Sequence, residues 1–581
     1  MSKLNVDQKT IYELFSGKHA DFLIPDYQRP YAWDEEQCQT LWDDIFTFAF
    51  PENNVDQFDD KKDEYFLGSV VTYKNGRDQS EVIDGQQRLT TLLLLLRAFF
   101  DKFSKMKDQN SLLTKKRIES CIWKTDAFGE AVKSELKIDS EVASDDDKDE
   151  FLELLKTGNI KINSKSKYVS NYLFFCKKID VFLQEFPSYF PYLPARILGN
   201  CILLPIEADS QDTALRIFST LNDRGLPLSD ADIFKAQFYK FYGKIGKKAE
   251  FIKSWKEIEK ISNRVFTSST SGAPMDELFT RYMYFLRAKE GIKSSTTEAL
   301  RKFYEKNKYQ YLNSEKTIKD LYELAIFWEK IKIQDENQFT IPVLKKLFVL
   351  HYAPNGMWQN MTSAYFLQNK DENGFLNEDN FIKFLNKMTA FIYTYALTNP
   401  GVNALRTPVY DEMISIVNNK EITFSKYKFN ENNTRTLFKT YIFTNQRSIT
   451  RSIITWYAFN FEDQQLLNLN EVFHLEHIFS KKRYQMESGL NNVDNLESLG
   501  NKVLLEESIN IKASDYRFED KKKIYSGIQR RGKNQFPSQI SEIQELICLN
   551  EFTEKTIVER SDKILEAFFD FLRVEELLLG S

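Results

Sequence analysis

The first part of the chain mixes short apolar runs with helical patterns. Residues 65–73 and 80–83 have the apolar and β-branched character of two strands, and a Lys-Asn-Gly turn follows the first of them. The apolar run 89–100 predicts a helix that is buried on most sides, so residues 84–88 are expected to form a strand-to-helix turn. These patterns predict a mixed α/β region over residues 1–240.

Residues 241–440 carry Lys, Glu, Leu, Phe and Tyr at helical spacing. The pattern is interrupted at 267–274, 353–356 and 399–401, where Gly and Pro occur. We therefore expect a helical middle domain with loops at these breaks. One further helix should end near residue 459 and belong to a compact third domain. We therefore expect three domains, over residues 1–240, 241–440 and 441–581.

Composition narrows the class of protein. The chain has 581 residues, of which 42% are hydrophobic and 28% charged, as in soluble globular proteins of several domains. Its five cysteines form no C-x-x-C pair, so neither a zinc site nor a disulfide framework is indicated. No signal-peptide core and no long apolar run occurs, which predicts a cytoplasmic protein without a membrane partner. The net charge of −5 excludes a uniformly basic nucleic-acid coat.

The C-terminal region contains a histidine and asparagine pattern with chemical meaning. His474-Leu-Glu476-His477-Ile is followed by Gly-Asn501-Lys-Val-Leu-Leu and then by Asn510-Ile-Lys. Metal-assisted phosphodiester hydrolysis needs a base for water and oxygen ligands for a hard cation. Glu476, His477 and Asn510 supply that set, and the apolar residues around them predict two strands and a helix.

Structural explanations exist for the same residues. A lone histidine on a strand is often packed or exposed, and Asn501 after a glycine suits a turn. His474-x-x-His477 is also a partial zinc pattern, but no other ligands lie near it in the sequence. The basic residues nearby have two equally good explanations. They can form a rim of Lys and Arg that contacts phosphate, or they can lie on ordinary solvated helix faces. The residues are Lys481, Lys482, Arg483, Lys521, Lys522, Lys523, Arg530, Arg531 and Lys533.

Two N-terminal motifs also carry candidate chemistry. Residues 24–33 place Tyr27, Gln28, Arg29 and Trp33 on a path that prolines keep extended, so they can stack on a base or anchor a core. Asp84, Gly85, Gln86, Gln87 and Arg88 stand at a predicted helix N-terminus. Free N–H groups and the helix dipole favour phosphate there, and Asp84 can hold Mg²⁺.

These motifs resemble a known family. The Glu-His-Ile, Gly-Asn-x-x-Leu-Leu and Asn-x-Lys blocks look like the HNH (His-Me finger, ββα-metal) domain that ends GmrSD-type modification-dependent (type IV) restriction endonucleases. The resemblance implies that His477 is the general base, that Glu476 and Asn510 bind the metal, and that Asn501 is a catalytic-site residue that orders the loop. Ser480 departs from the proline common in the family.

The N-terminal motifs resemble the other end of the same family, whose fold is similar to ParB and sulfiredoxin. The Asp84–Arg88 motif implies nucleotide binding and hydrolysis, and Tyr27, Gln28, Arg29 and Trp33 are the expected DNA and modification sensors. Residues 218–232 resemble a third block, in which Ser229 is expected to cap a helix.

The resemblance implies a multidomain α+β, predominantly helical protein with a ParB/sulfiredoxin-like N-terminal domain, a helical middle and an HNH nuclease domain. Its implied function is an NTP-regulated endonuclease or nickase that uses Mg²⁺ or Mn²⁺ and cuts modified phage DNA. The preferred nucleotide remains open among GTP, ATP and CTP. The sensed modification remains open between glucosylated or hydroxymethylated cytosine and a phosphorothioate backbone, as in SspE-like relatives. Whether the protein forms a homodimer is also open. The alternative is a nucleotide-dependent DNA-binding regulator whose HNH-like domain does not catalyse.

Overall fold

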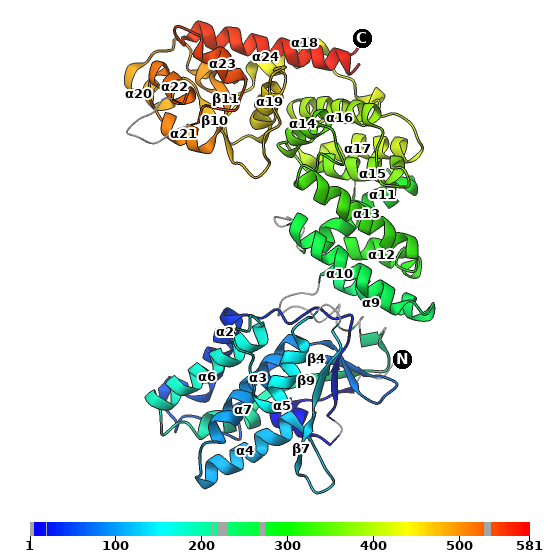
Figure 1. Ribbon diagram of the computed structural model, residues 1–581, viewed down its shortest axis with the longest axis vertical. Helices are drawn as coiled ribbons and strands as arrows, with labels where there is room; N and C mark the ends of the chain where they lie inside the picture. Colours follow the sequence, from blue (N-terminus) through cyan, green and yellow to red (C-terminus); the bar gives the residue numbers. More distant parts are fainter. Residues whose placement is uncertain are drawn as a thin grey trace. The chain divides into compact units, whose positions relative to one another are not determined.

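The structure is a computed structural model. It describes residues 5–18, 20–142, 145–211, 213–214, 217, 229–266, 273–294, 296–527 and 536–580. Backbone contacts divide the chain into two compact units, Met1–Lys256 and Glu257–Ser581, whose elements are labelled in Figure 1. The boundary expected at 440 therefore falls inside the second unit.

A mixed sheet is the centre of the first unit. Its strands run in the order β1-β9-β4-β5-β3-β8, and β2 also pairs with β9. β4 is antiparallel to β5, as the turn between them predicts, and parallel to β9. The strands of this sheet are β1 Asn5–Val6, β2 Lys9–Thr10, β3 Phe22–Ile24, β4 Tyr65–Lys74, β5 Ser80–Asp84, β8 Ile138–Ser140 and β9 Cys201–Ala208, and β6 Trp123–Thr125 with β7 Ala131–Leu136 forms a separate pair.

The main core of this unit lies between one face of the sheet and α3 (Gln86–Phe103), which other helices surround in Figure 1. Leu92 and Leu95 of α3 are fully buried, which confirms the predicted interior helix. The helix begins earlier than predicted, so Gln86 to Arg88 form its first turn. The other helices of the unit are α1 Ile11–Ser16, α2 Glu35–Ala49, α4 Gln109–Ile122, α5 Lys148–Thr157, α6 Lys167–Glu185, α7 Tyr192–Asn200 and α9 Asp230–Lys244, and α10 Lys248–Val265 spans the boundary.

The opposite face of the sheet has a smaller core, in which Val71, Ile83 and Ile206 pack against α9. The Ser229 hydroxyl accepts a hydrogen bond from the Asp232 N–H, and the Asp232 side chain accepts one from the N–H of Ser229, which confirms the predicted helix cap. Most of the 218–232 block lies outside the described residues.

The second unit begins with helices, which confirms the helical middle. Their ends coincide with the predicted breaks at 353–356 and 399–401, because Pro and Gly end one helix before the next begins. Among the described helices, none is long and apolar enough to cross a membrane. The helices are α11 Pro274–Lys289, α12 Leu300–Tyr309, α13 Glu315–Lys332, α14 Ile341–His351, α15 Met357–Asn369, α16 Glu378–Thr398, α17 Val402–Val417 and α18 Glu431–Thr440.

A two-stranded hairpin lies in the last part of the unit. The C-terminal helix α24 (Glu554–Val574) packs against α16, α19 and the turn η4, so it contacts both the helical array and the hairpin region. The other elements of this part are α19 Ser448–Ala458, β10 Phe473–His477, α20 Lys481–Glu487, η3 Val493–Glu497, η4 Leu499–Asn501, β11 Lys502–Glu506, α21 Glu507–Ala513, α22 Phe518–Tyr525 and α23 Glu542–Ile547.

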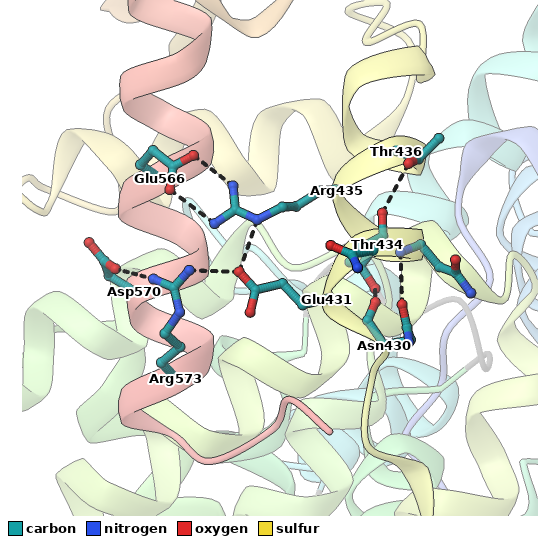
Figure 2. A network of polar contacts seen from close by, with 10 residues as sticks. Asn430, Glu431, Thr434, Arg435, Thr436, Glu566, Asp570 and Arg573 are labelled. Atoms are coloured by element: carbon teal, nitrogen blue, oxygen red, sulfur yellow. Dashed lines mark hydrogen bonds and ion pairs between the residues drawn. The ribbon is translucent and has the colours of Figure 1, made fainter. Parts of the chain in front are cut away.

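Helices α18 and α24 are joined by a network of ion pairs, shown in Figure 2. Arg435 makes two bonds to the carboxylate of Glu566, at 2.6 and 3.0 Å, and Glu431 accepts from both Arg435 and Arg573. Exposed ion pairs contribute only about 0–1 kcal/mol each. We expect the buried Phe438 of α18 to contribute more, because its ring packs 5.4 Å from that of Phe568.

A fragment of residues 421–581 should therefore be more stable than one of residues 441–581. The shorter fragment lacks Phe438 and Arg435, and loss of one buried phenylalanine side chain costs about 3–5 kcal/mol. Thermal unfolding followed by circular dichroism measures the difference. Equal melting temperatures would show that α18 does not stabilise α24.

Candidate functional site

The predicted two strands and helix are present in the second unit. β10 and β11 are antiparallel, and the register places His477 directly opposite Lys502. α21 follows β11 at once and packs against both strands. Because directly opposed residues share one face of a hairpin, the side chains of His477 and Lys502 meet.

The imidazole of His477 is held in a buried polar cluster. Its Nε2 lies 2.8 Å from the Lys502 ammonium and 3.4 Å from a carboxylate oxygen of Glu497, and only 15% of its side chain is exposed. Burial lowers the pKa of His477 to about 4, and the positive charge of Lys502 acts in the same direction. His477 is therefore neutral at physiological pH, and one of its ring nitrogens has a lone pair.

The other members of the cluster fix the direction of these hydrogen bonds. The Lys502 ammonium also donates to Glu497 and Asn445, each at 2.8 Å. Burial lowers the pKa of Lys502 to about 8, so the amine stays mostly protonated at neutral pH. An ammonium can only donate, so Nε2 of His477 accepts and Nδ1 carries the ring proton.

Glu497 is the anion of the cluster. Burial would raise its pKa, but hydrogen bonds from Lys481 and Lys502 outweigh burial and lower the pKa to about 2. Lys481 is about half exposed and reaches Glu497 from α20. The carboxylate therefore joins a cation at the surface to the buried cation beside His477.

Glu476 lies on the other face of β10, since neighbouring residues of a strand point to opposite sides. Its Oε1 accepts hydrogen bonds from the buried Lys521 at 2.6 Å and from Tyr525 at 3.1 Å. Burial raises the pKa of Glu476, although Lys521 opposes that shift. Neither a phosphate rim nor a solvated helix face describes Lys521, because its side chain is fully buried and pairs with Glu476.

Asn501 is fully buried, and its side chain holds the loop that joins the strands. Its Oδ1 accepts from the backbone N–H of Phe479 at 2.7 Å, and its Nδ2 donates to the carbonyl oxygens of Phe479 and Leu496, each at 3.0 Å. Three internal bonds occupy this amide. In the structure Asn501 therefore orders the backbone beside His477.

Asn510 of α21 has an oxygen without a partner. Its Oδ1 is buried and accepts no hydrogen bond in the described part of the chain. An orphaned acceptor of this kind suits a cation or a water. His474 is 41% exposed and pairs with Glu507 at 3.2 Å, and nowhere among the described residues do three His, Cys, Asp or Glu side chains gather as a metal cluster. Magnesium commonly takes only one or two protein oxygens, so Glu476 and Asn510 are a chemically suitable pair.

Helix α24 fixes the backbone that carries Asn501 and Lys502. The buried Arg560 donates to the carbonyl oxygens of Gly500 and Lys502 and pairs with the buried Glu542. A Cβ on Gly500 would overlap the carbonyl oxygen of Ile557, so only glycine allows this approach. No pattern in the sequence points to Arg560, which stands sixty residues from Gly500.

In the first unit, the motif 84–88 forms the end of β5, the cap of α3 and the first residues of that helix. Gly85 caps the helix with φ +92°, a conformation that suits glycine. Arg88 donates to the carbonyl oxygen of Ser69 at 2.8 Å. Burial raises the pKa of Asp84 and lowers that of Arg88, while the attraction between the two charges opposes both shifts. A carboxylate and a guanidinium thus lie together at a helix N-terminus.

Three amides join this motif to residues 24–33. Gln28 donates to the carbonyl oxygens of Val82 and Ile83, and Gln86 donates to Gln28 at 3.0 Å. Gln87 accepts from the N–H of Ala32 at 2.7 Å and donates to the carbonyl oxygen of Pro30. All three side chains are buried. The two motifs therefore form one structure, in which these amides have internal partners.

The expected sensors differ in accessibility. Tyr27 is buried and donates to Glu81 at 2.8 Å, and Gln28 is buried as described above. Trp33 and Arg29 are partly exposed, and Trp33 packs against the main core. Direct contact with DNA requires accessible atoms, so Arg29 and Trp33 stay as candidates for it.

Sequence reasoning did not single out Lys502, Glu497 or Asn445. A signal was present for Lys502, because a lysine that starts the apolar run Val503, Leu504, Leu505 needs a buried partner. Arg530, Arg531 and Lys533 of the expected phosphate rim lie outside the described residues.

Comparison with known families agrees with the motifs. Residues 11–239 match the N-terminal domain of GmrSD restriction endonucleases, and residues 421–567 match their C-terminal domain. The chain belongs to the GmrSD restriction endonuclease family. No curated protein matches the chain. The GmrSD C-terminal match starts before α18, which agrees with the packing of α18 on α24.

Two arginines of α24 provide a matched test of the hairpin support. Arg560→Met should lower the free energy of unfolding by about 3–5 kcal/mol, because it leaves Glu542 as a buried charge without its cation. Arg573→Met removes only partly exposed ion pairs and should cost about 0–1 kcal/mol. Urea denaturation of the two variants measures both values. Similar losses would mean that Arg560 does not hold the hairpin.

Proposed function

We propose that this GmrSD-family chain is a metal-dependent DNA endonuclease or nickase of antiviral restriction, with His477 as its general base. The neutral imidazole of His477 on a two-strand and helix arrangement carries the proposal. A base must be unprotonated to take a proton from water, and the low pKa meets that requirement. The family match supports the nuclease class and DNA as the partner.

In this proposal Glu476 and Asn510 would hold Mg²⁺ or Mn²⁺. Bound there, the cation would stabilise negative charge on the phosphate. Asn501 keeps the loop beside His477 in place. Before His477 can accept a proton, Nε2 must lose its hydrogen bond from Lys502. Glu497 and Asn445 already accept from the same ammonium, so Lys502 keeps partners when it turns away.

The first unit would bind a nucleotide at residues 84–88 and regulate cutting. A phosphate would meet the N-terminus of α3 and Arg88, and Asp84 would hold the cation that accompanies GTP, ATP or CTP. The partly buried Asp84 and Arg88 support this assignment, since perturbed charges often mark functional sites. Arg29 and Trp33 would sense modified DNA, with Tyr27 and Gln28 supporting them.

A second function is favoured by one observation. Glu476 is paired with Lys521, and the His477 lone pair is taken by Lys502. Both groups have internal partners, as in a domain that binds DNA without cutting it. The alternative is therefore a nucleotide-dependent DNA-binding regulator, and cleavage assays separate the two.

His477→Ala should reduce plasmid nicking by roughly 10²–10⁴-fold in Mg²⁺ or Mn²⁺, because the general base is lost. His474→Ala is the matched control, since His474 is on the same strand but 41% exposed. Gel assays with modified phage DNA measure both variants. Nicking at the wild-type rate by His477→Ala would remove the assignment, and absence of nicking by the wild type on every substrate would favour the regulator.

Arg88→Gln should abolish NTP turnover and leave the melting temperature of the second unit unchanged, because the guanidinium that would meet phosphate is lost. Arg117→Gln, which alters a partly exposed arginine of the same unit, should keep wild-type turnover. Phosphate release from GTP, ATP and CTP is the measurement. Normal turnover in Arg88→Gln would place hydrolysis elsewhere.

A further inference from the structure

A pocket of about 540 Å³ with both charged and aromatic lining residues opens in the first unit on the sheet face opposite α3. Its lining comes from the segment after β3, from β4 and β5, and from α9 and the turn after it. None of the motif residues 84–88 lines it. The volume is within the roughly 300–1,000 Å³ typical of small-molecule sites. This pocket is therefore separate from the proposed nucleotide motif.

The floor of the pocket presents two carboxylates. Glu81 of β5 is buried and accepts a hydrogen bond from Tyr27 at 2.8 Å, and Tyr73 stands opposite it on β4. Asp26 accepts from Tyr239. A carboxylate has about four acceptor positions, so these tyrosines orient both groups and leave further capacity to accept. The floor therefore suits a ligand that presents N–H donors.

Aromatic rings form part of the wall. Tyr27 and Tyr239 lie with ring centroids 5.7 Å apart, and Tyr73 stands on the neighbouring strand. Tyr239 and Tyr73 are only partly buried, so they offer ring surface to the pocket. Bases in nucleic-acid sites stack on aromatic rings exposed in this way.

The rim is cationic. The Lys248 ammonium lies 4.3 Å above the Tyr239 ring, and Lys240 and Lys244 are also in the lining. Arg77 is at the rim too, paired with Glu141 at 3.2 Å. The pocket has carboxylate acceptors in its lining and several lysines at its entrance. This arrangement favours a ligand with hydrogen-bond donors on one edge and a negatively charged group at its other end.

We propose that this pocket binds a nucleobase that carries an exocyclic amino group, with its phosphate at the lysine rim. Glu81 and Asp26 would accept from the amino edge, in the way that carboxylates read the N4 amine of cytosine. Tyr73 and Tyr239 would stack on the base and Lys248 would contact the phosphate. The same chemistry is present in a free nucleotide and in a base swung out of a DNA strand. The DNA source rests on the proposed function, and the free nucleotide does not.

The test uses the full chain and two mononucleotides, CMP and UMP, in titration calorimetry. Uracil has a carbonyl where cytosine has the amine, so CMP should bind about tenfold more tightly. Glu81→Gln should remove this preference, because its amide can donate to uracil. Lys248→Gln, at an exposed position, should weaken both ligands several-fold. Glu185→Gln, at an exposed position of α6, is the control and should match the wild type.

A DNA duplex with 2-aminopurine beside hydroxymethylated cytosine tests the other source. Base extrusion should raise the fluorescence in the wild type and not in Glu81→Gln or Lys248→Gln. Glu185→Gln, the exposed control position of α6, should keep both signals. If neither CMP binding nor fluorescence depends on Glu81 or Lys248, the proposal is wrong. Base binding without plasmid nicking would instead contradict the proposed function alone.

Discussion

Buried positive charges next to the hairpin β10–β11 determine how this part of the chain is built. Lys502, Lys521 and Arg560 are all buried, and each is paired with a carboxylate, from Glu497, Glu476 and Glu542. Breaking such a pair leaves an uncompensated charge and costs several kcal/mol. Each pair also joins a strand or its loop to another element. Each of these buried charges needs its carboxylate partner, and the resulting pairs also fix the positions of His477 and Asn501.

Two of these pairs lie on opposite faces of β10. On one face Lys502 sets the hydrogen bonding of His477, and on the other Lys521 takes up Glu476. The proposed base and the proposed metal ligand are neighbours in the sequence, and different cations pair with them. In the first unit amides have the corresponding role, because Gln28, Gln86 and Gln87 join two motifs that are more than fifty residues apart.

The elements of the site could be predicted from sequence, and their partners could not. Alternation and apolar runs such as Val503 to Leu505 indicate strands, and the Ser229 cap follows from local rules. Lys521 stands in a run of three lysines, and only the fold decides which of them is buried. Tyr27 belongs to a motif whose amino-acid sequence does not show which side chains are exposed to solvent. Long-range packing makes these choices, so one sequence leaves them open.

The order of synthesis gives the Arg560 contact a further consequence. Gly500 and Lys502 leave the ribosome about sixty residues before Arg560, which holds their carbonyl oxygens. At 5–20 residues per second this interval lasts roughly 3–12 seconds. During that time the hairpin exists without the helix that fixes it. A nascent chain therefore carries His477 before it has the support of α24, and the hairpin reaches its final form only after translation has passed that helix.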